Sequence, residues 1–149
     1  MGGPADPLAV LGSRLGHGFR DRELFLRALT HRSYANEHPP EPDNEALAFL
    51  GDAVLSLVVA EHLWTASPQQ PVGALTPERA LLVSGANLAR WADGVGVGRH
   101  LRLGRGEGKS GGQSKESVLA TALEALLGVV YLEDGLAAAR LAVARLAGW

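Results

Sequence analysis

The residues with the clearest potential for chemistry lie in the segment Asn44–Leu55, where acids interrupt an otherwise apolar stretch. In a helix, residues three, four and seven apart share a face, so Glu45, Ala48 and Asp52 project from one side. Glu45 and Asp52 offer carboxylates to that face, whereas Ala48 offers only a methyl group. A metal-binding face needs an acid at that position. The pattern predicts either an enzyme or a domain that has lost part of its metal site.

A further acid, Glu124, stands in a second apolar segment, 117–128, that is also predicted to be helical. Carboxylates from two packed helices make an oxygen-rich site suited to Mg²⁺ or Mn²⁺. A structural alternative has Glu45 at a helix start, Asp52 paired with a buried Arg or His31, and Glu124 half exposed. Spacing alone favours this alternative, and a lone histidine such as His31 is more often a structural residue than a ligand.

A basic, glycine-rich segment covers residues 99–115. Its five Lys and Arg residues against the single acid Glu107 make it +4, whereas the whole chain is −2. Glycines let backbone amides approach an anion, and Arg, Lys, Ser and Gln donate to phosphates. The candidate RNA-binding residues are Arg99, Arg102, Arg105, Lys109, Ser110, Gln113 and Lys115. The alternative is a flexible, solvated loop, and no Walker-type spacing is present.

Composition predicts one soluble domain over residues 1–149. The chain is 46% hydrophobic but only 5% aromatic, which favours helices over strands. It lacks cysteine, which excludes disulfides and thiolate sites and fits a cytoplasmic location. Neither a membrane span nor a secretory signal is expected.

Caps and breakers divide the chain into predicted helices, with no strand-like alternation and no internal repeat. The central helix, from residue 43 or 44 to about 64, is expected to be buried nearly all round. Residues 94–112 contain eight glycines and are expected to lack regular helix. The other predicted helices cover residues 7–15, 21–29, 76–82, 86–94 and 115–132, and a last one runs from a break at 134–135 to 149. This pattern predicts an all-α bundle.

Taken together, these segments resemble the ribonuclease III family. The matching stretches, in family order, are 29–37, 44–55, 82–84, 87–90, 103–112, 116–117 and 124–132. The resemblance implies an all-helical endonuclease domain that forms a two-fold dimer around the segment Asn44–Leu55. It also implies a valley for double-stranded RNA and one catalytic centre per subunit. The chain ends at Trp149 without the RNA-binding domain of many members, so RNA affinity is expected from the valley and the basic segment.

The resemblance also identifies two substitutions. The family carries Glu, Glu and Asp at the positions of Glu45, Ala48 and Asp52, and Asp and Glu at those of Thr121 and Glu124. All of these acids except the first surround the catalytic Mg²⁺, so Asp52 and Glu124 are the retained ligands. Glu45 lies roughly 10 Å along the helix from Asp52, too far to replace the missing acid. Weak metal binding and severely impaired hydrolysis are therefore expected.

Three functions remain open from the sequence. The first is a homodimeric domain that engages double-stranded RNA in RNA processing with impaired catalysis. The second is an active endoribonuclease that uses Asp52 and Glu124, with help from Glu45 or Thr121, and Mg²⁺ or Mn²⁺. The third is a non-catalytic assembly module, which binds ribosomal RNA or forms a heterodimer with an active homologue.

Overall fold

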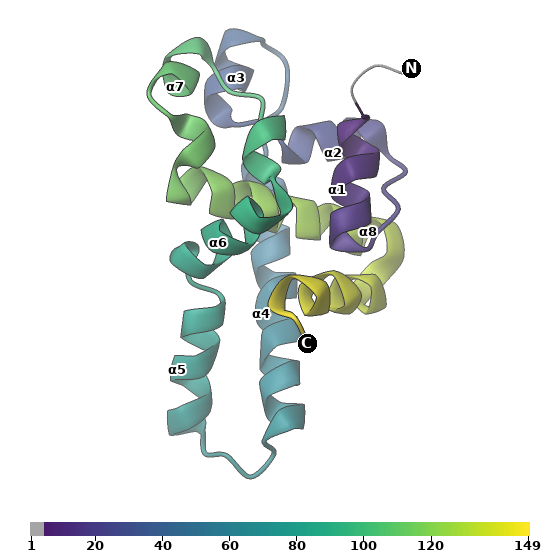
Figure 1. Ribbon diagram of the computed structural model, residues 1–149, viewed down its shortest axis with the longest axis vertical. Coiled ribbons are helices and arrows are strands. Elements are labelled where there is room, and N and C mark those ends of the chain that lie inside the picture. The colour runs from purple at the N-terminus through teal and green to yellow at the C-terminus, as the bar shows by residue number, and fades with distance from the viewer. Residues whose placement is uncertain (1–4) are drawn as a thin grey trace.

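A computed structural model describes residues 5–149, and its described elements are all helical (Figure 1). This confirms the predicted all-α class. Backbone pairing outside helices includes one isolated parallel bridge between Thr30 and Arg102. In chain order the elements are α1 (Pro7–Leu15), α2 (Arg22–Ala28), α3 (Arg32–Glu37), α4 (Glu45–Ala66), α5 (Val72–Leu82), α6 (Gly85–Val95), the 3₁₀ turn η1 (Val97–His100), α7 (Arg105–Lys109), the 3₁₀ turn η2 (Gly112–Ser114) and α8 (Glu116–Ala147).

The centre of the fold is the crossing of α4 and α8 (Figure 1). The two backbones touch at a pair of glycines. A Cβ atom on Gly51 would overlap the carbonyl oxygen of Glu124, and one on Gly128 would lie 2.6 Å from the carbonyl oxygen of Leu47. Only residues without side chains permit this approach. The close crossing determines which residues of the two helices face each other.

One face of α4 packs into the core and the opposite face is uncovered. Leu55 and Val59 are fully buried, whereas the side chains of Phe49 and Trp64 are 82% and 64% exposed. The expectation of burial nearly all round is therefore wrong for a single chain, because this face stays largely exposed even though α5 packs beside the second half of α4. By length and composition alone α4 could also span a membrane. Its packing against α8 is that of a core helix with one free face.

Several helix boundaries differ from the prediction. Helix α5 begins at Val72 instead of residue 76, so Pro77 lies inside it. A proline within a helix removes one backbone hydrogen bond, and α5 tolerates this on the surface, where none of its residues is buried. The glycine-rich segment contains the short helix α7, which the glycine content did not predict, and α3 was also missed. Helices α1 and α2 begin within one residue of their predicted starts, where the carboxylates of Asp6 and Asp21 accept from helix N–H groups.

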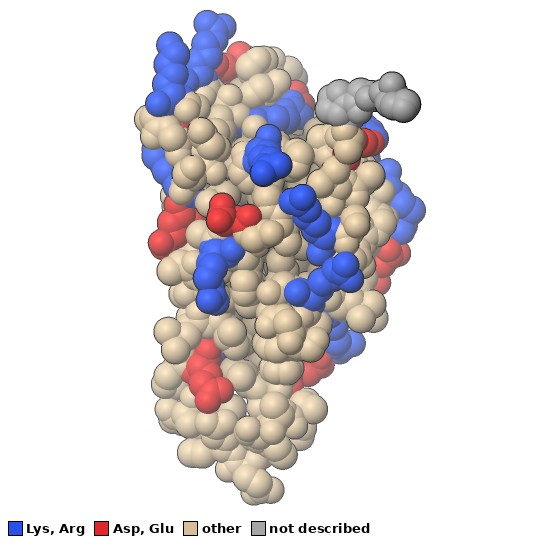
Figure 2. Space-filling model, in the orientation of Figure 1, with Lys and Arg blue, Asp and Glu red and all other residues tan. Residues whose placement is uncertain are grey.

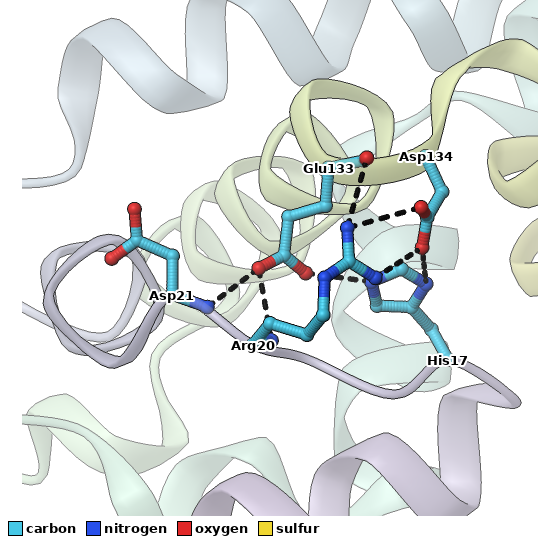
Figure 3. A network of polar contacts seen from close by, with 5 residues as sticks. All are labelled: His17, Arg20, Asp21, Glu133 and Asp134. Carbon is cyan, nitrogen blue, oxygen red and sulfur yellow. Dashed lines mark hydrogen bonds and ion pairs between the residues drawn. The ribbon is translucent and has the colours of Figure 1, made fainter.

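The predicted break in the last helix is present. At Gly135 the φ angle is 77°, which kinks α8. A polar network holds the chain before α2 against this kink (Figure 3). The Glu133 carboxylate accepts from the backbone N–H groups of Arg20 and Asp21 and lies 2.8 Å from Nε2 of His17. The guanidinium of Arg20 donates to Asp134. This network fixes where the last part of α8 packs.

Candidate active site

Asp52 of α4 and Glu124 of α8 meet beside the glycine crossing. Burial, together with the neighbouring Asp52 carboxyl, raises the pKa of Glu124 to about 8. At neutral pH Glu124 is therefore mostly protonated and can donate to the Asp52 carboxylate. Because α4 and α8 touch through Gly51, the predicted pairing of these acids across two helices is present.

The two substituted positions flank this pair. Ala48 lies one helical turn before Asp52 and is buried, and Thr121 lies one turn before Glu124 and is half-buried. Neither supplies a carboxylate. Among residues 5–149, no three His, Asp or Glu side chains gather closely enough to hold a metal ion. The donors at the crossing are thus two carboxyl groups and the neutral hydroxyl of Thr121, a set that suits a hydrated hard cation better than a tightly enclosed one.

Glu45 and His31 have other partners. The Glu45 carboxylate is exposed at the start of α4, and it lies 3.7 Å from Nε of Arg32 in α3. His31 caps α3, because its Nδ1 accepts from the backbone N–H of Ser33 at 3.1 Å. The structural interpretation of His31 is confirmed. The alternative pairing of Asp52 with an Arg or with His31 is wrong, because Asp52 faces Glu124 instead.

The basic segment does not form one flexible loop. The backbone N–H of Gly104 donates to Oγ of Ser33, and that of Arg105 donates to Oε2 of Glu37, both at 2.8 Å. A Cβ atom on Gly104 would lie 2.7 Å from the carbonyl oxygen of Ser33, so glycine is needed for this contact. These partners are 71 and 68 residues apart in the chain, and no local sequence signal identifies them. The start of α7 is therefore held firmly against α3.

Several cations of the segment already have acidic partners. The guanidinium of Arg102 lies 4.5 Å from the ring centre of Tyr34 and 3.2 Å from the Glu41 carboxylate. Nζ of Lys115 lies 2.5 Å from Glu107. Arg102 and Lys115 are therefore less available to an external phosphate than the sequence suggested.

The remaining candidates are open to solvent. The Arg105 side chain is 93% exposed, although its guanidinium lies 3.8 Å from Glu37. Basic side chains project over α3 and α7 at the top of the molecule (Figure 2). Four other candidates, Arg99, Lys109, Ser110 and Gln113, are also exposed. Arg99 belongs to η1, whereas the other three lie at the end of α7 or after it, so the segment presents two separate groups of donors.

Known proteins are similar to this chain in sequence and in fold. A ribonuclease 3 of Symbiobacterium thermophilum is 50% identical over 131 residues, which cover 88% of this chain and 55% of the relative. One of Pseudomonas fluorescens is 51% identical over 133 residues, 89% of this chain and 56% of the relative. The chain thus spans about half the length of these curated relatives.

Solved structures of related nucleases resemble this chain as well. The nuclease domain of a ribonuclease III from Campylobacter jejuni superposes with a TM-score of 0.87 at 37% identity, covering 93% of this chain and 94% of that one. A Dicer from Pichia stipitis matches 79% of this chain and 49% of its own with a TM-score of 0.59 at 26% identity. The Ribonuclease-III-like family model matches residues 21–147. The chain therefore belongs to the ribonuclease III-like family.

Proposed function

We propose that this chain is a dimeric nuclease-type domain that engages double-stranded RNA and in which Ala48 and Thr121 weaken metal-dependent phosphodiester hydrolysis. The observation that carries the proposal is the pair of Asp52 and Glu124 at the crossing of α4 and α8, with an alanine and a threonine in the flanking turns. The chain thus keeps the family's fold but retains two of the four acids that would surround the metal ion.

Asp52 and Glu124 are the residues that would hold Mg²⁺ or Mn²⁺. A bound metal ion would supply Lewis-acid activation of water and offset charge on the scissile phosphate. Glu124 first has to lose its proton, because a carboxylate ligand binds the cation in its ionised form. Each missing acid also removes a negative charge that would attract the cation. We therefore expect metal affinity well below that of a site with four carboxylates.

The uncovered face of α4 supports a dimer. Phe49, Leu57 and Trp64 are exposed along one helix, and the last two help to line an apolar groove of about 430 Å³ between α4 and α5. Exposed apolar surface of this kind marks an interaction site. The similar nuclease domain from Campylobacter jejuni is described as flexible in a region involved in dimer formation. A two-fold contact between copies would cover the α4 face on both.

Double-stranded RNA is the substrate class that fits the charge pattern. Duplex RNA is recognised mostly through its shape, phosphates and 2′-hydroxyls. The exposed donors Arg99, Arg105 and Lys109 suit phosphates, which position a nucleic acid without reading its sequence. Arg102 and Lys115 are expected to contribute less, because their charges are already paired.

The test compares cleavage of long double-stranded RNA, with Mg²⁺ or Mn²⁺, by the unmodified protein and by an Ala48→Glu/Thr121→Asp variant. We expect the unmodified protein to bind RNA and cut it slowly or not at all, and the variant to cut much faster. Asp52→Asn in the restored variant is the control and should abolish cleavage.

Other outcomes support the competing functions. Ordinary turnover by the unmodified protein, abolished by Asp52→Asn or Glu124→Gln, identifies an active endoribonuclease. A folded protein that does not bind double-stranded RNA at low salt points to an assembly module. Binding to an active homologue would then be checked by co-purification of the two chains as a heterodimer.

A further inference from the structure

Three arginines from distant parts of the sequence gather on one surface. Arg14 is in α1, Arg99 in η1 and Arg145 near the end of α8, and all three are exposed. On the face shown in Figure 2, Lys and Arg side chains lie over the region where α1 and the last part of α8 meet, with no acidic side chain between them. We call Arg14, Arg99 and Arg145 the arginine triad.

Backbone contacts hold two members of the triad in place. Nη1 of Arg14 donates to the carbonyl oxygen of Val95 at 2.8 Å, and Nε of Arg145 donates to the carbonyl oxygen of Arg14 at 3.1 Å. Glycines make room for both side chains. A Cβ atom on Gly96 would lie 2.6 Å from Nη1 of Arg14, and one on Gly16 would lie 3.0 Å from Cδ of Arg145. The guanidinium groups are thus positioned by the fold.

The three guanidinium groups of the triad have no ion-pair partner among the described residues, since no acidic side chain there lies within 4.0 Å of any of them. Burial and the positive charges of Arg14 and Arg99 lower the pKa of His100, which lies among them. Gathering like charges without a counterion is unfavourable, and a bound anion would relieve the repulsion.

We propose that the arginine triad is a second contact site for the phosphate backbone of double-stranded RNA. It is separate from the donors near α7, because α7 lies beside α3, away from α1 (Figure 1). Arginine suits this role because its planar guanidinium can donate two hydrogen bonds to one phosphate. The triad consists of cationic donors alone, so it would bind the backbone whatever the base sequence. This inference rests on the proposed engagement of double-stranded RNA.

The test measures how the affinity for two double-stranded RNAs of different sequence depends on salt concentration. Each phosphate contact contributes about 0.9 to the slope of log affinity against log salt for duplex nucleic acid. We expect Arg14→Gln/Arg145→Gln to reduce the slope by about 2, equally for both RNAs. Arg22→Gln/Arg140→Gln is the matched control. It removes the same charge, but these arginines are paired with Asp6 and Glu61, so its slope should stay near that of the unmodified protein.

A third variant covers the case in which the double variant fails to fold. The side chain of Arg99 makes no hydrogen bond within the described residues, so Arg99→Gln should leave the fold intact and reduce the slope by about 1.

Each outcome decides between the proposals. Equal slopes for the unmodified protein and Arg99→Gln, or an equal loss in the matched control, overturn the triad site and leave the proposed function standing. If Arg14→Gln/Arg145→Gln abolishes binding to phosphatidylserine vesicles and leaves the RNA slope unchanged, the triad binds a lipid surface. That result also overturns the proposed RNA contact. An unmodified protein that fails to bind RNA at about 50 mM salt overturns both proposals.

Discussion

Replacing Glu124 by glutamine should stabilise the fold in a pH-dependent way. Burial and the neighbouring Asp52 raise the pKa of Glu124 from 4.5 to about 8. Between these two pH values the folded protein holds a proton that the unfolded chain has lost. The free energy of unfolding should therefore fall as the pH rises through this window, and be unaffected by this group below it. Glu124→Gln removes the titration and keeps a group that can donate to Asp52.

The size of the effect follows from the pKa. Each tenfold change in proton affinity corresponds to about 1.4 kcal/mol, so a rise from 4.5 to about 8 corresponds to roughly 5 kcal/mol. Glu124 is only half-buried, and solvent screening reduces this figure to about 1–2 kcal/mol. We expect the variant to match the unmodified protein near pH 4.5 and to exceed it by that amount above the pKa of about 8.

Urea unfolding at fixed protein concentration, with a chelator present, measures this difference. Glu116→Gln is the matched control, because Glu116 is an exposed acid at the start of the same helix. Its effect on the free energy of unfolding should not grow with pH. A Glu124→Gln effect of equal size at both ends of the pH window would refute the reasoning. Asp52→Asn should lower the pKa of Glu124 and weaken the pH dependence.

Three further predictions concern the scaffold. Gly51→Ala should lower the free energy of unfolding, measured in urea, by about 3 kcal/mol, because the added methyl group would force α4 away from Glu124. An unchanged urea midpoint would contradict the close crossing of α4 and α8. Glu133→Gln should cost about 2 kcal/mol in thermal unfolding, because the carboxylate accepts two backbone N–H groups beside His17. Asp43→Asn should cost less, because the Asp43 carboxylate accepts one backbone N–H group among the described residues, that of Glu45. Phe49→Asp should shift the protein toward monomer in analytical ultracentrifugation, because Phe49 is largely exposed on the free face of α4. Retention of the unmodified protein's mass by this variant would place the dimer contact elsewhere.

Local sequence patterns predicted most of the helices because their signals are local. Asp6 with Pro7 and Asp21 each mark a helix start, and both carboxylates accept from the first turn. The break at Gly135 was equally predictable, because a glycine at positive φ interrupts a helix. Helix α7 escaped prediction because its start depends on distant partners, Ser33 and Glu37 of α3.

The types of the site residues could be identified from the sequence, but the contacts between their side chains could not. The spacing of Glu45, Ala48 and Asp52 placed them on one helical face, since a helix repeats every 3.6 residues. Only the packing of Gly51 against α8 brings Asp52 and Glu124 together and raises the pKa of Glu124.

The basic residues also show which features the sequence predicts and which the fold decides. Composition located the basic segment 99–115 as one group of donors. The fold pairs Arg102 and Lys115 with acids and places Arg99 with Arg14 and Arg145, which are far away in the sequence. The sequence by itself determined the family, the helices and the missing acids, because these depend on residue type and local spacing. The tertiary structure decided which charges meet and which remain free, because that depends on contacts between segments far apart in the chain.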